Sequence, residues 1–286
     1  MKTAIFSLIL VLSVFSSGPV TAKHGISAKT INQVTKDLGE KPDILITINM
    51  RNIKSSYFYS KLLPLATQQA QKEKEMCFDK INMKSIDYAL ITGRVKKPNV
   101  KEAVAVVVSG SFNSVAFLDC VAKRNKLVTF RKDGVSGYRE KKGQNYAFAV
   151  GPGSILMIQG DYINKIKLKK GSLGTGSISS MVSRHAVSAK VDRMEKGSEI
   201  KSLSGRVEIK NDIKAIGNCT WKSLKERNDF DKKMKEFQKS PFVSTFMTGL
   251  KYTFSGTKMD LSYLLTKQQF DALFFLSKSL INKPKK

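Results

Sequence analysis

The chain has 286 residues, of which 50 are Lys or Arg and 23 are Asp or Glu, so its formal net charge at pH 7 is +27. Hydrophobic residues make up 41% of the chain and include 16 Phe, which is more apolar material than a disordered polycation carries. Residues 196–286 have a net charge of +10 and residues 1–195 a net charge of +17, so the charge is not confined to a basic tail. The chain is therefore expected to be a folded protein with a basic surface, which favours anionic partners.

The first 22 residues have the pattern of a secretory signal peptide. Lys2 precedes a short apolar stretch over residues 5–15, and Val20-Thr21-Ala22 supplies a small-residue cleavage site. The apolar stretch is too short to span a bilayer comfortably, and no lipid-attachment cysteine follows it. We therefore expect an exported, soluble, periplasmic or secreted protein, whose mature chain starts near Lys23 and lacks a transmembrane segment.

Residues 23–195 are predicted to form a first α+β module. Apolar residues that alternate along the chain predict strands over 43–50, 86–95 and 103–112, and a DG turn joins two more strands before residue 140. Helices are expected after the first strand, with Pro64 as a kink or late start, and after the N-cap Asn113. The order β-α-β-β-α-β is that of a split βαβ, or ferredoxin-like, unit, in which two helices cover one face of an antiparallel sheet. Residues 161–195 have no single interpretation: Lys165-Ile166-Lys167-Leu168-Lys169 alternates as an edge strand would, whereas Tyr162, Ile163 and Ile166 fit a short helix equally well.

Residues 196–286 are predicted to form a second α+β module, in the order β-β-α-β-β-α. Its boundary with the first is placed in the polar stretch between Val191 and Ile200. Two capping boxes open its helices. They are Ser223 with Glu226, and Thr266 with Gln269. The apolar residues expected to be buried by these helices are Leu224, Phe230, Met234 and Phe237 in the first and Phe270, Leu273, Phe274, Leu276 and Leu280 in the second.

Three cysteines provide a test of the first module. An exported chain meets an oxidising compartment, so one pair can be bridged and one thiol left over. Cys77 ends the first predicted helix and Cys120 lies in the second, and a split βαβ unit sets those helices side by side. We expect a disulfide between Cys77 and Cys120, with Cys219 free.

The motifs of common enzymes and metal sites are missing from the sequence. It has no Cys-x-x-Cys and no Gly-x-Ser-x-Gly elbow, and its histidines are His24 and His185. A lone histidine beside Arg184 is more typical of a surface than of a catalytic base. The glycine-rich loop over 171–177 lacks a following Gly-Lys-Ser/Thr, so we read it as a flexible connection. We expect no metal, no cofactor and no catalytic residue, although a hydrolase with an unrecognised site stays an alternative.

Clusters of basic residues are the candidate binding sites. They are Lys96 and Lys97 in one turn, Arg139, Lys141 and Lys142 after a hairpin, and Lys165, Lys167, Lys169 and Lys170 beside the glycine-rich loop. Each cluster taken alone is also compatible with an ordinary solvated face. Together they predict binding to polyanions that weakens steeply with added salt. No motif that reads nucleic-acid sequence accompanies them, so any binding to nucleic acid is expected to be non-specific.

Several stretches resemble a group of uncharacterised, exported bacterial envelope proteins built from repeated α+β modules. These stretches are Ile86-Asp87-Tyr88-Ala89-Leu90-Ile91, residues 104–112 with Phe117-Leu118-Asp119-Cys120, and residues 206–222 with the helix that follows. The resemblance implies an exported α+β protein and brings no catalytic residues. We therefore expect a non-catalytic binding or structural protein that engages an anionic envelope polymer, lipid head groups or lipopolysaccharide. A module that binds a protein partner is a further alternative.

Overall fold

The computed structural model describes residues 43–72, 77, 85–94, 103–149, 153–164, 185–192, 198–239, 244 and 247–281. The strands in these ranges are β1 (Ile44–Asn49), β2 (Ile86–Arg94), β3 (Ala103–Gly110), β4 (Val128–Lys132), β5 (Val135–Arg139), β6 (Asn145–Ala149), β7 (Ser154–Gln159), β8 (Val187–Val191), β9 (Ile200–Ile209), β10 (Ile213–Trp221), β11 (Leu250–Ser255) and β12 (Lys258–Leu265). The helices are α3 (Met50–Lys54), α4 (Tyr57–Lys72), α5 (Ser114–Arg124), the 3-10 helix η4 (Asp161–Asn164), α7 (Leu224–Gln238) and α9 (Lys267–Ile281).

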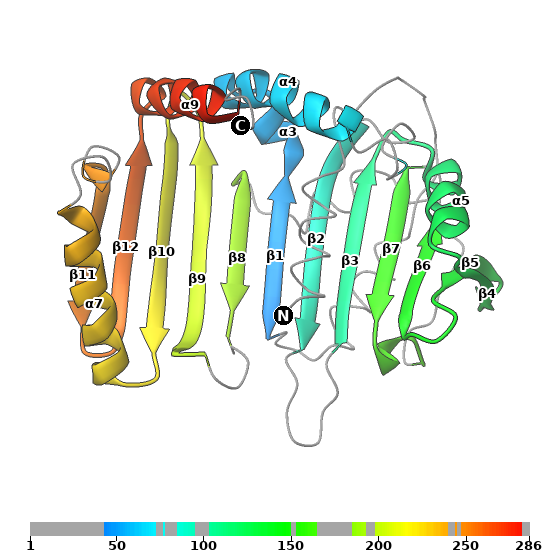
Figure 1. The fold of residues 1–286 in the computed structure, drawn as a ribbon. Coiled ribbons are helices and arrows are strands. Elements are labelled where there is room, and N and C mark those ends of the chain that lie inside the picture. The colour runs from blue at the N-terminus through cyan, green and yellow to red at the C-terminus, as the bar shows by residue number, and fades with distance from the viewer. Residues whose placement is uncertain are drawn as a thin grey trace, which may run out of the picture.

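The strands form one twelve-stranded sheet in the order β11-β12-β10-β9-β8-β1-β2-β3-β7-β6-β5-β4 (Figure 1). Every neighbouring pair in it is antiparallel. Helices α3, α4 and α9 lie along one end of the central strands, whereas α5 and α7 lie near the two sides of the sheet (Figure 1). The α+β class expected from the sequence is confirmed.

The helix starts follow from local hydrogen bonds that the sequence predicts. The Asn113 side chain accepts a bond from the Ala116 N–H at 3.0 Å at the start of α5. The Ser223 hydroxyl accepts from the Glu226 N–H at 3.2 Å, which opens α7. Thr266 and Gln269 bond reciprocally before α9. These side chains satisfy backbone donors that a helix leaves unpaired in its first turn, so the predicted caps are confirmed.

Strands β1, β2, β3 and β7 are covered on both faces, and β2 and β3 are buried along almost their whole length. One face holds a cluster around Leu90, Val107 and Phe148. The other face packs Ile91 and Val106 against α5 and neighbouring residues. This half of the sheet therefore contains the main core.

The sheet is covered differently at β9 to β12. Trp221, Cys219 and Met259 form a small cluster on one face, and Phe230 of α7 packs against the Trp221 ring at 4.9 Å between centroids. The opposite face of these strands carries mainly polar side chains. That face is taken up below as a candidate site.

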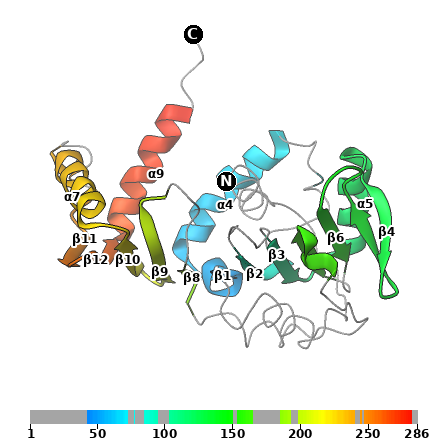
Figure 2. The same cartoon turned by 90° about the horizontal axis from the view of Figure 1, so that it is seen from below.

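The predicted split βαβ unit is wrong. Such a unit places a third strand between two parallel strands, whereas β1 and β2 are direct antiparallel neighbours, with Ile46 opposite Ile91. The physical reason is the path of the connection. Helices α3 and α4 lie at one end of the strands (Figure 1), and Figure 2 shows α4 extending to one side of the sheet, so the chain returns beside β1 in the opposite direction.

In the segment over 161–195, residues 161–164 form the 3-10 helix η4, and the alternating residues 165–169 lie outside the described residues. The segment also contains strand β8. It pairs with β1 on one side and with β9 on the other, so one sheet continues through the two predicted modules. In α7, two residues expected to be buried are exposed. Leu224 and Phe237 are 52% and 64% exposed, because they stand in the first and last turns of a helix that packs on a small cluster.

The disulfide links the pair of cysteines expected from the sequence. Cys77 and Cys120 are bonded with their Cα atoms 5.8 Å apart, which fastens the segment after α4 to α5. Cys219 is a free, buried thiol on β10. The pairing therefore matches the expectation even though the strand order used to reach it does not.

Candidate functional site

The residues predicted to bind anions fall in two groups. Lys96, Lys97, Lys165, Lys167, Lys169 and Lys170 lie outside the described residues. Arg139, Lys141 and Lys142 are described and exposed. They belong to β5 and the turn after it, at the side of the sheet formed by β4, β5 and α5 (Figure 1).

The fold brings further cations to the same place. Residues 119–142 contain eight Lys or Arg against three Asp or Glu, a net charge of +5. We call the exposed cations of this segment the basic edge. They are Lys123, Arg124, Lys126, Arg131, Arg139, Lys141 and Lys142. Sequence reasoning found three of them and missed the rest, because a helix end and an edge strand separate them along the chain.

The cations of the basic edge surround the terminal strand of the sheet. Arg131 lies on the face of β4 that carries Thr129, the register partner of Tyr138. Arg139 lies on the other face, with its guanidinium 5.7 Å from the centroid of the Phe130 ring. Since β4 has a sheet neighbour on one side only, its outward main-chain groups are also open to a ligand.

The acidic side chains of this segment are already engaged. Asp119 accepts a hydrogen bond from the Tyr138 hydroxyl at 2.7 Å, which raises the pKa of Tyr138. Glu140 accepts from the Asn145 amide at 2.9 Å, and Asp133 lies 3.9 Å from the ammonium of Lys132. Among the ion pairs found in the described residues, none neutralises a cation of the basic edge. Its positive charge is therefore available to a partner.

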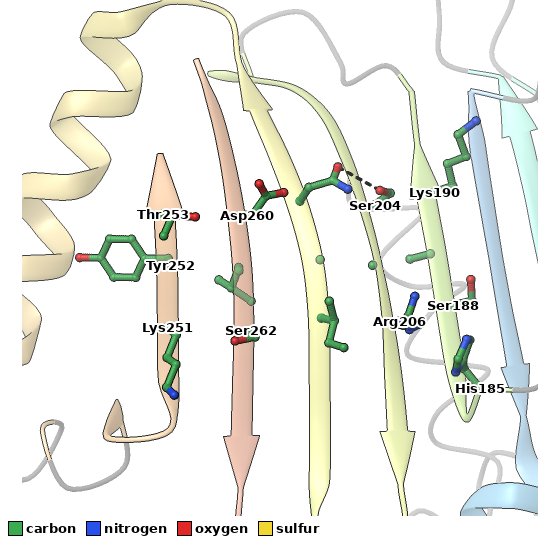
Figure 3. A pocket seen from close by; sticks show the side chains of 16 residues that line it. His185, Ser188, Lys190, Ser204, Arg206, Lys251, Tyr252, Thr253, Asp260 and Ser262 are labelled. Carbon is green, nitrogen blue, oxygen red and sulfur yellow. Dashed lines mark hydrogen bonds between the residues drawn. The ribbon is translucent and has the colours of Figure 1, made fainter. Parts of the chain in front are cut away.

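A second candidate site lies at the opposite side of the sheet. It is an open groove of about 750 Å³ on the polar face of β8 to β12, which we call the polar groove (Figure 3). Its side chains include hydroxyls, an amide, a carboxylate and cations. They are Ser188, Lys190, Ser204, Arg206, Asn218, Lys251, Thr253, Asp260 and Ser262, with His185 at one end.

The cations at the β8 and β9 side of the polar groove have acidic neighbours. The ammonium of Lys190 is 3.1 Å from Asp192, and Nε of Arg206 is 3.3 Å from Glu208. His185 Nδ1 is 3.5 Å from the same Glu208 oxygen. The groove is therefore polar with mixed charge, unlike the basic edge.

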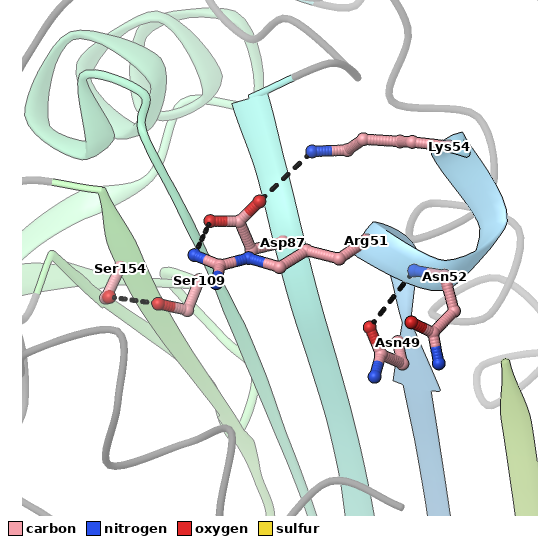
Figure 4. Close-up of polar contacts among 7 residues, drawn as sticks. All are labelled: Asn49, Arg51, Asn52, Lys54, Asp87, Ser109 and Ser154. Atoms are coloured by element: carbon pink, nitrogen blue, oxygen red, sulfur yellow. Dashed lines mark hydrogen bonds and ion pairs between the residues drawn. The ribbon is translucent and has the colours of Figure 1, made fainter. Parts of the chain in front are cut away.

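A third polar cluster is structural. Asp87 is a buried residue of β2, and its carboxylate accepts from Arg51 at 2.9 Å and from Lys54 at 3.1 Å (Figure 4). The hydrogen bond to Asp87 raises the pKa of the Arg51 guanidinium. The same guanidinium lies 5.2 Å from the centroid of the Tyr88 ring. These contacts fix α3 against β2, since a buried carboxylate needs such partners. Within the described residues, no group of three His, Cys, Asp or Glu is arranged to hold a metal ion.

Comparisons with known proteins do not assign this chain to a family. No protein-family model and no curated protein matches the chain. Two solved structures, crystal forms I and III of TP0453, align with TM-scores of 0.42 at 10% and 9% identity, over 83% of this chain and 94% and 95% of theirs. A TM-score this low supports no argument from fold or function. Each helix in the described ranges is too short or too polar to cross a bilayer.

Proposed function

We propose that this chain is an exported, non-catalytic binding protein whose basic edge engages an anionic component of the bacterial envelope. The observation that carries the proposal is the set of seven exposed cations gathered on α5, β4, β5 and the turn after them. The signal-peptide pattern and the resemblance to envelope proteins support an exported location. Repeating phosphates or carboxylates, as on lipid head groups, lipopolysaccharide or an anionic polymer, are the fitting ligand chemistry.

The arrangement favours an extended ligand over a small one. The cations stand on both faces of the edge strand, at the end of α5 and in the adjoining turn, so they are spread over more surface than one small anion can contact. Each exposed contact is worth little alone, because solvent screens it, but a polyanion can meet several of them at once. Such binding loses affinity steeply as salt is added.

Two structural roles explain part of this charge. Cations on an edge strand discourage pairing with another sheet, and cations in the last turn of α5 complement the helix dipole. Arg131 serves the first role, and Lys123 and Arg124 serve the second. Lys141 and Lys142 lie in a turn outside both settings. Because neither structural role explains Lys141 and Lys142, their place beside the other cations of the basic edge favours a ligand-binding role.

The test is a salt titration of binding to anionic vesicles, lipopolysaccharide and DNA. The variant changes Lys123, Arg131, Lys141 and Lys142 to Gln, and the matched control changes the exposed Lys225, Lys232, Lys233 and Lys239 of α7 to Gln. For DNA, the slope of log affinity against log salt should become shallower by roughly 0.9 for each phosphate that the variant no longer neutralises. We expect this in the variant and much less in the control. Equal effects in both proteins, or binding that salt does not weaken, contradict the proposal.

A further inference from the structure

The polar groove is built from two rows of side chains that the strand register aligns on one face. The first row is Thr253, Asp260, Asn218, Ser204 and Lys190. The second row is Lys251, Ser262, Ile216, Arg206 and Ser188. Neighbours in a row stand about 5 Å apart across the strands. This face therefore presents two parallel rows of mainly hydrogen-bonding side chains.

The centre of the groove pairs a donor with an acceptor. The Ser204 hydroxyl donates to the Asn218 side-chain oxygen at 3.0 Å, so the amide N–H groups of Asn218 remain as donors for a ligand. Asp260 is the register partner of Asn218 on β12 and offers carboxylate oxygens that accept. Each hydroxyl of a sugar both donates and accepts. A pair of adjacent sugar hydroxyls therefore matches this amide and carboxylate.

The two rows of the groove carry few large apolar side chains. The Tyr252 ring points away from the groove's centre, and its hydroxyl donates to Asp231 of α7 at 3.4 Å (Figure 3). Ile216 is the single large apolar side chain in the two rows. The rows therefore hold no cluster of large apolar side chains that would take an acyl chain. The groove favours a hydroxyl-rich ligand held by polar contacts.

Cations lie toward the ends of the rows. Lys251 and Arg206 belong to the same row with β12 and β10 between their strands, which places them roughly 14 Å apart at the usual strand spacing. Arg206 and Lys190 are 47% and 57% exposed, so their ion pairs with Glu208 and Asp192 are weak and can give way to a ligand. Anionic groups on a ligand fit these ends, and neutral hydroxyls fit the middle.

We propose that the polar groove is a second binding site, for a short oligosaccharide that carries carboxylate or phosphate groups. Asp260 and Asn218 bind its hydroxyls, and Lys251 and Arg206 bind its anionic groups. The site is independent of the basic edge, because β8 to β12 and β4 to β5 lie at opposite sides of the sheet (Figure 1). Either proposal can fail without the other.

The decisive variant is Asp260→Asn, because two mechanisms of binding predict opposite changes in ligand affinity. If the groove attracts anions by charge alone, removal of a carboxylate tightens binding. If Asp260 accepts hydroxyl hydrogen bonds, the same change weakens binding by about tenfold or more, since bonds to charged groups are the stronger ones. Asp260 is exposed, so the variant should fold, and Asp229→Asn on α7 is the matched control with unchanged binding.

The measurement is calorimetric titration with a short oligogalacturonate and with a phosphorylated mannan fragment, in the protein whose Lys123, Arg131, Lys141 and Lys142 are changed to Gln so that the basic edge does not contribute. Short dextran serves as the uncharged comparator and inorganic polyphosphate as the anion without hydroxyls. We expect at least one anionic saccharide to bind, Asp260→Asn and Asn218→Ala to weaken it, and Lys251→Gln to weaken it while dextran binding stays unchanged. Polyphosphate has no hydroxyls, so Asp260→Asn and Asn218→Ala should not weaken its binding. Absence of binding to both anionic saccharides, or unchanged or tighter binding by Asp260→Asn, overturns the proposal.

Discussion

Phe58 in α4 and Phe270 in α9 pack edge to face, with their ring centroids 4.8 Å apart. Both side chains are buried, and they join the first long helix of the described chain to the last. The neighbouring Tyr57 hydroxyl donates to Asp271 at 2.6 Å, and the Lys267 ammonium is 4.1 Å from the Tyr57 ring centroid. These contacts hold α4 and α9 together along one end of the sheet (Figures 1 and 2).

This packing predicts that Phe270→Ala strongly destabilises the protein. Truncation of a buried Phe removes apolar burial and leaves a cavity, which costs about 3–5 kcal/mol in the free energy of unfolding. Phe275 in the same helix is 74% exposed, so Phe275→Ala should change stability by no more than about 0.5 kcal/mol. Urea unfolding of both variants compares the two sites. Similar losses of stability at the two positions contradict the proposed packing between α4 and α9.

The disulfide predicts a second stability difference. A bridge between Cys77 and Cys120 spans a sequence separation of 43 residues and restricts the unfolded chain. Replacement of both cysteines by Ser should lower the free energy of unfolding by roughly 2–4 kcal/mol. Reduction of the native protein should lower it by a similar amount, and reductant should have no effect on the double variant. A wild-type protein that reductant leaves unchanged is the contrary result.

Sequence patterns specified the elements well and their pairing less well. Caps such as Asn113 and Ser223 and the turn at Asp133-Gly134 depend on a few neighbouring residues, so they can be recognised locally. Strand order depends on the path of each connection. The sequence of residues 50–85 has no pattern that predicts the place of α3 and α4 at the end of the strands. That path makes β1 and β2 antiparallel neighbours.

Strand β8 shows a different limit. Val187, Ala189 and Val191 alternate as in a strand, but the segment is short and polar residues surround it. Its place is set by partners on both sides, β1 and β9, that are distant in sequence. The candidate sites have the same property. The polar groove needs side chains from strands β8 to β12, and a basic cluster read along the chain finds only part of the basic edge.

The free cysteine predicts a concealed thiol. Cys219 is 4% exposed, beside Trp221 and Met259, and burial raises the pKa of its thiol. A higher pKa and a lack of access both slow its reaction, since the thiolate is the reactive form. A thiol reagent should modify no cysteine in the folded, oxidised protein and one after unfolding without reductant. Rapid labelling of the folded protein contradicts this packing of β10 under α7.

Asp231 in α7 predicts an effect of pH. The bond from the Lys235 ammonium at 2.8 Å lowers the pKa of Asp231 below its ordinary value of 3.8, and the Tyr252 hydroxyl contributes. A pKa lowered by folding gives stability that is present above the ordinary pKa and is lost as the pH falls through the folded one. Lys235→Gln should therefore raise the pKa of Asp231 toward 3.8. Carbon NMR titration of the carboxyl group measures the change, and Lys239→Gln should leave that pKa unchanged.

Two glycines with positive φ predict different costs for the same substitution. Gly134 in the turn between β4 and β5 has φ of +76°, and a Cβ there would meet nothing within 4 Å. Gly153 before β7 has φ of +81°, and a Cβ there would overlap the carbonyl oxygen of Gly110, whose N–H donates to Gly153 at 2.8 Å. Gly134→Ala should cost about 1–2 kcal/mol, the strain of a left-handed alanine.

Gly153→Ala should lower the free energy of unfolding by the strain of a left-handed alanine and by about 1–3 kcal/mol more, because the backbone of β3 must move to admit the methyl group. The two variants differ from the native chain by one methyl group each, so their difference in unfolding free energy isolates the close approach between β3 and the turn before β7. Chemical denaturation of both proteins under the same conditions measures it. Equal costs at the two positions are incompatible with the close approach between Gly153 and the Gly110 carbonyl oxygen, at the end where β3 stops and β7 begins.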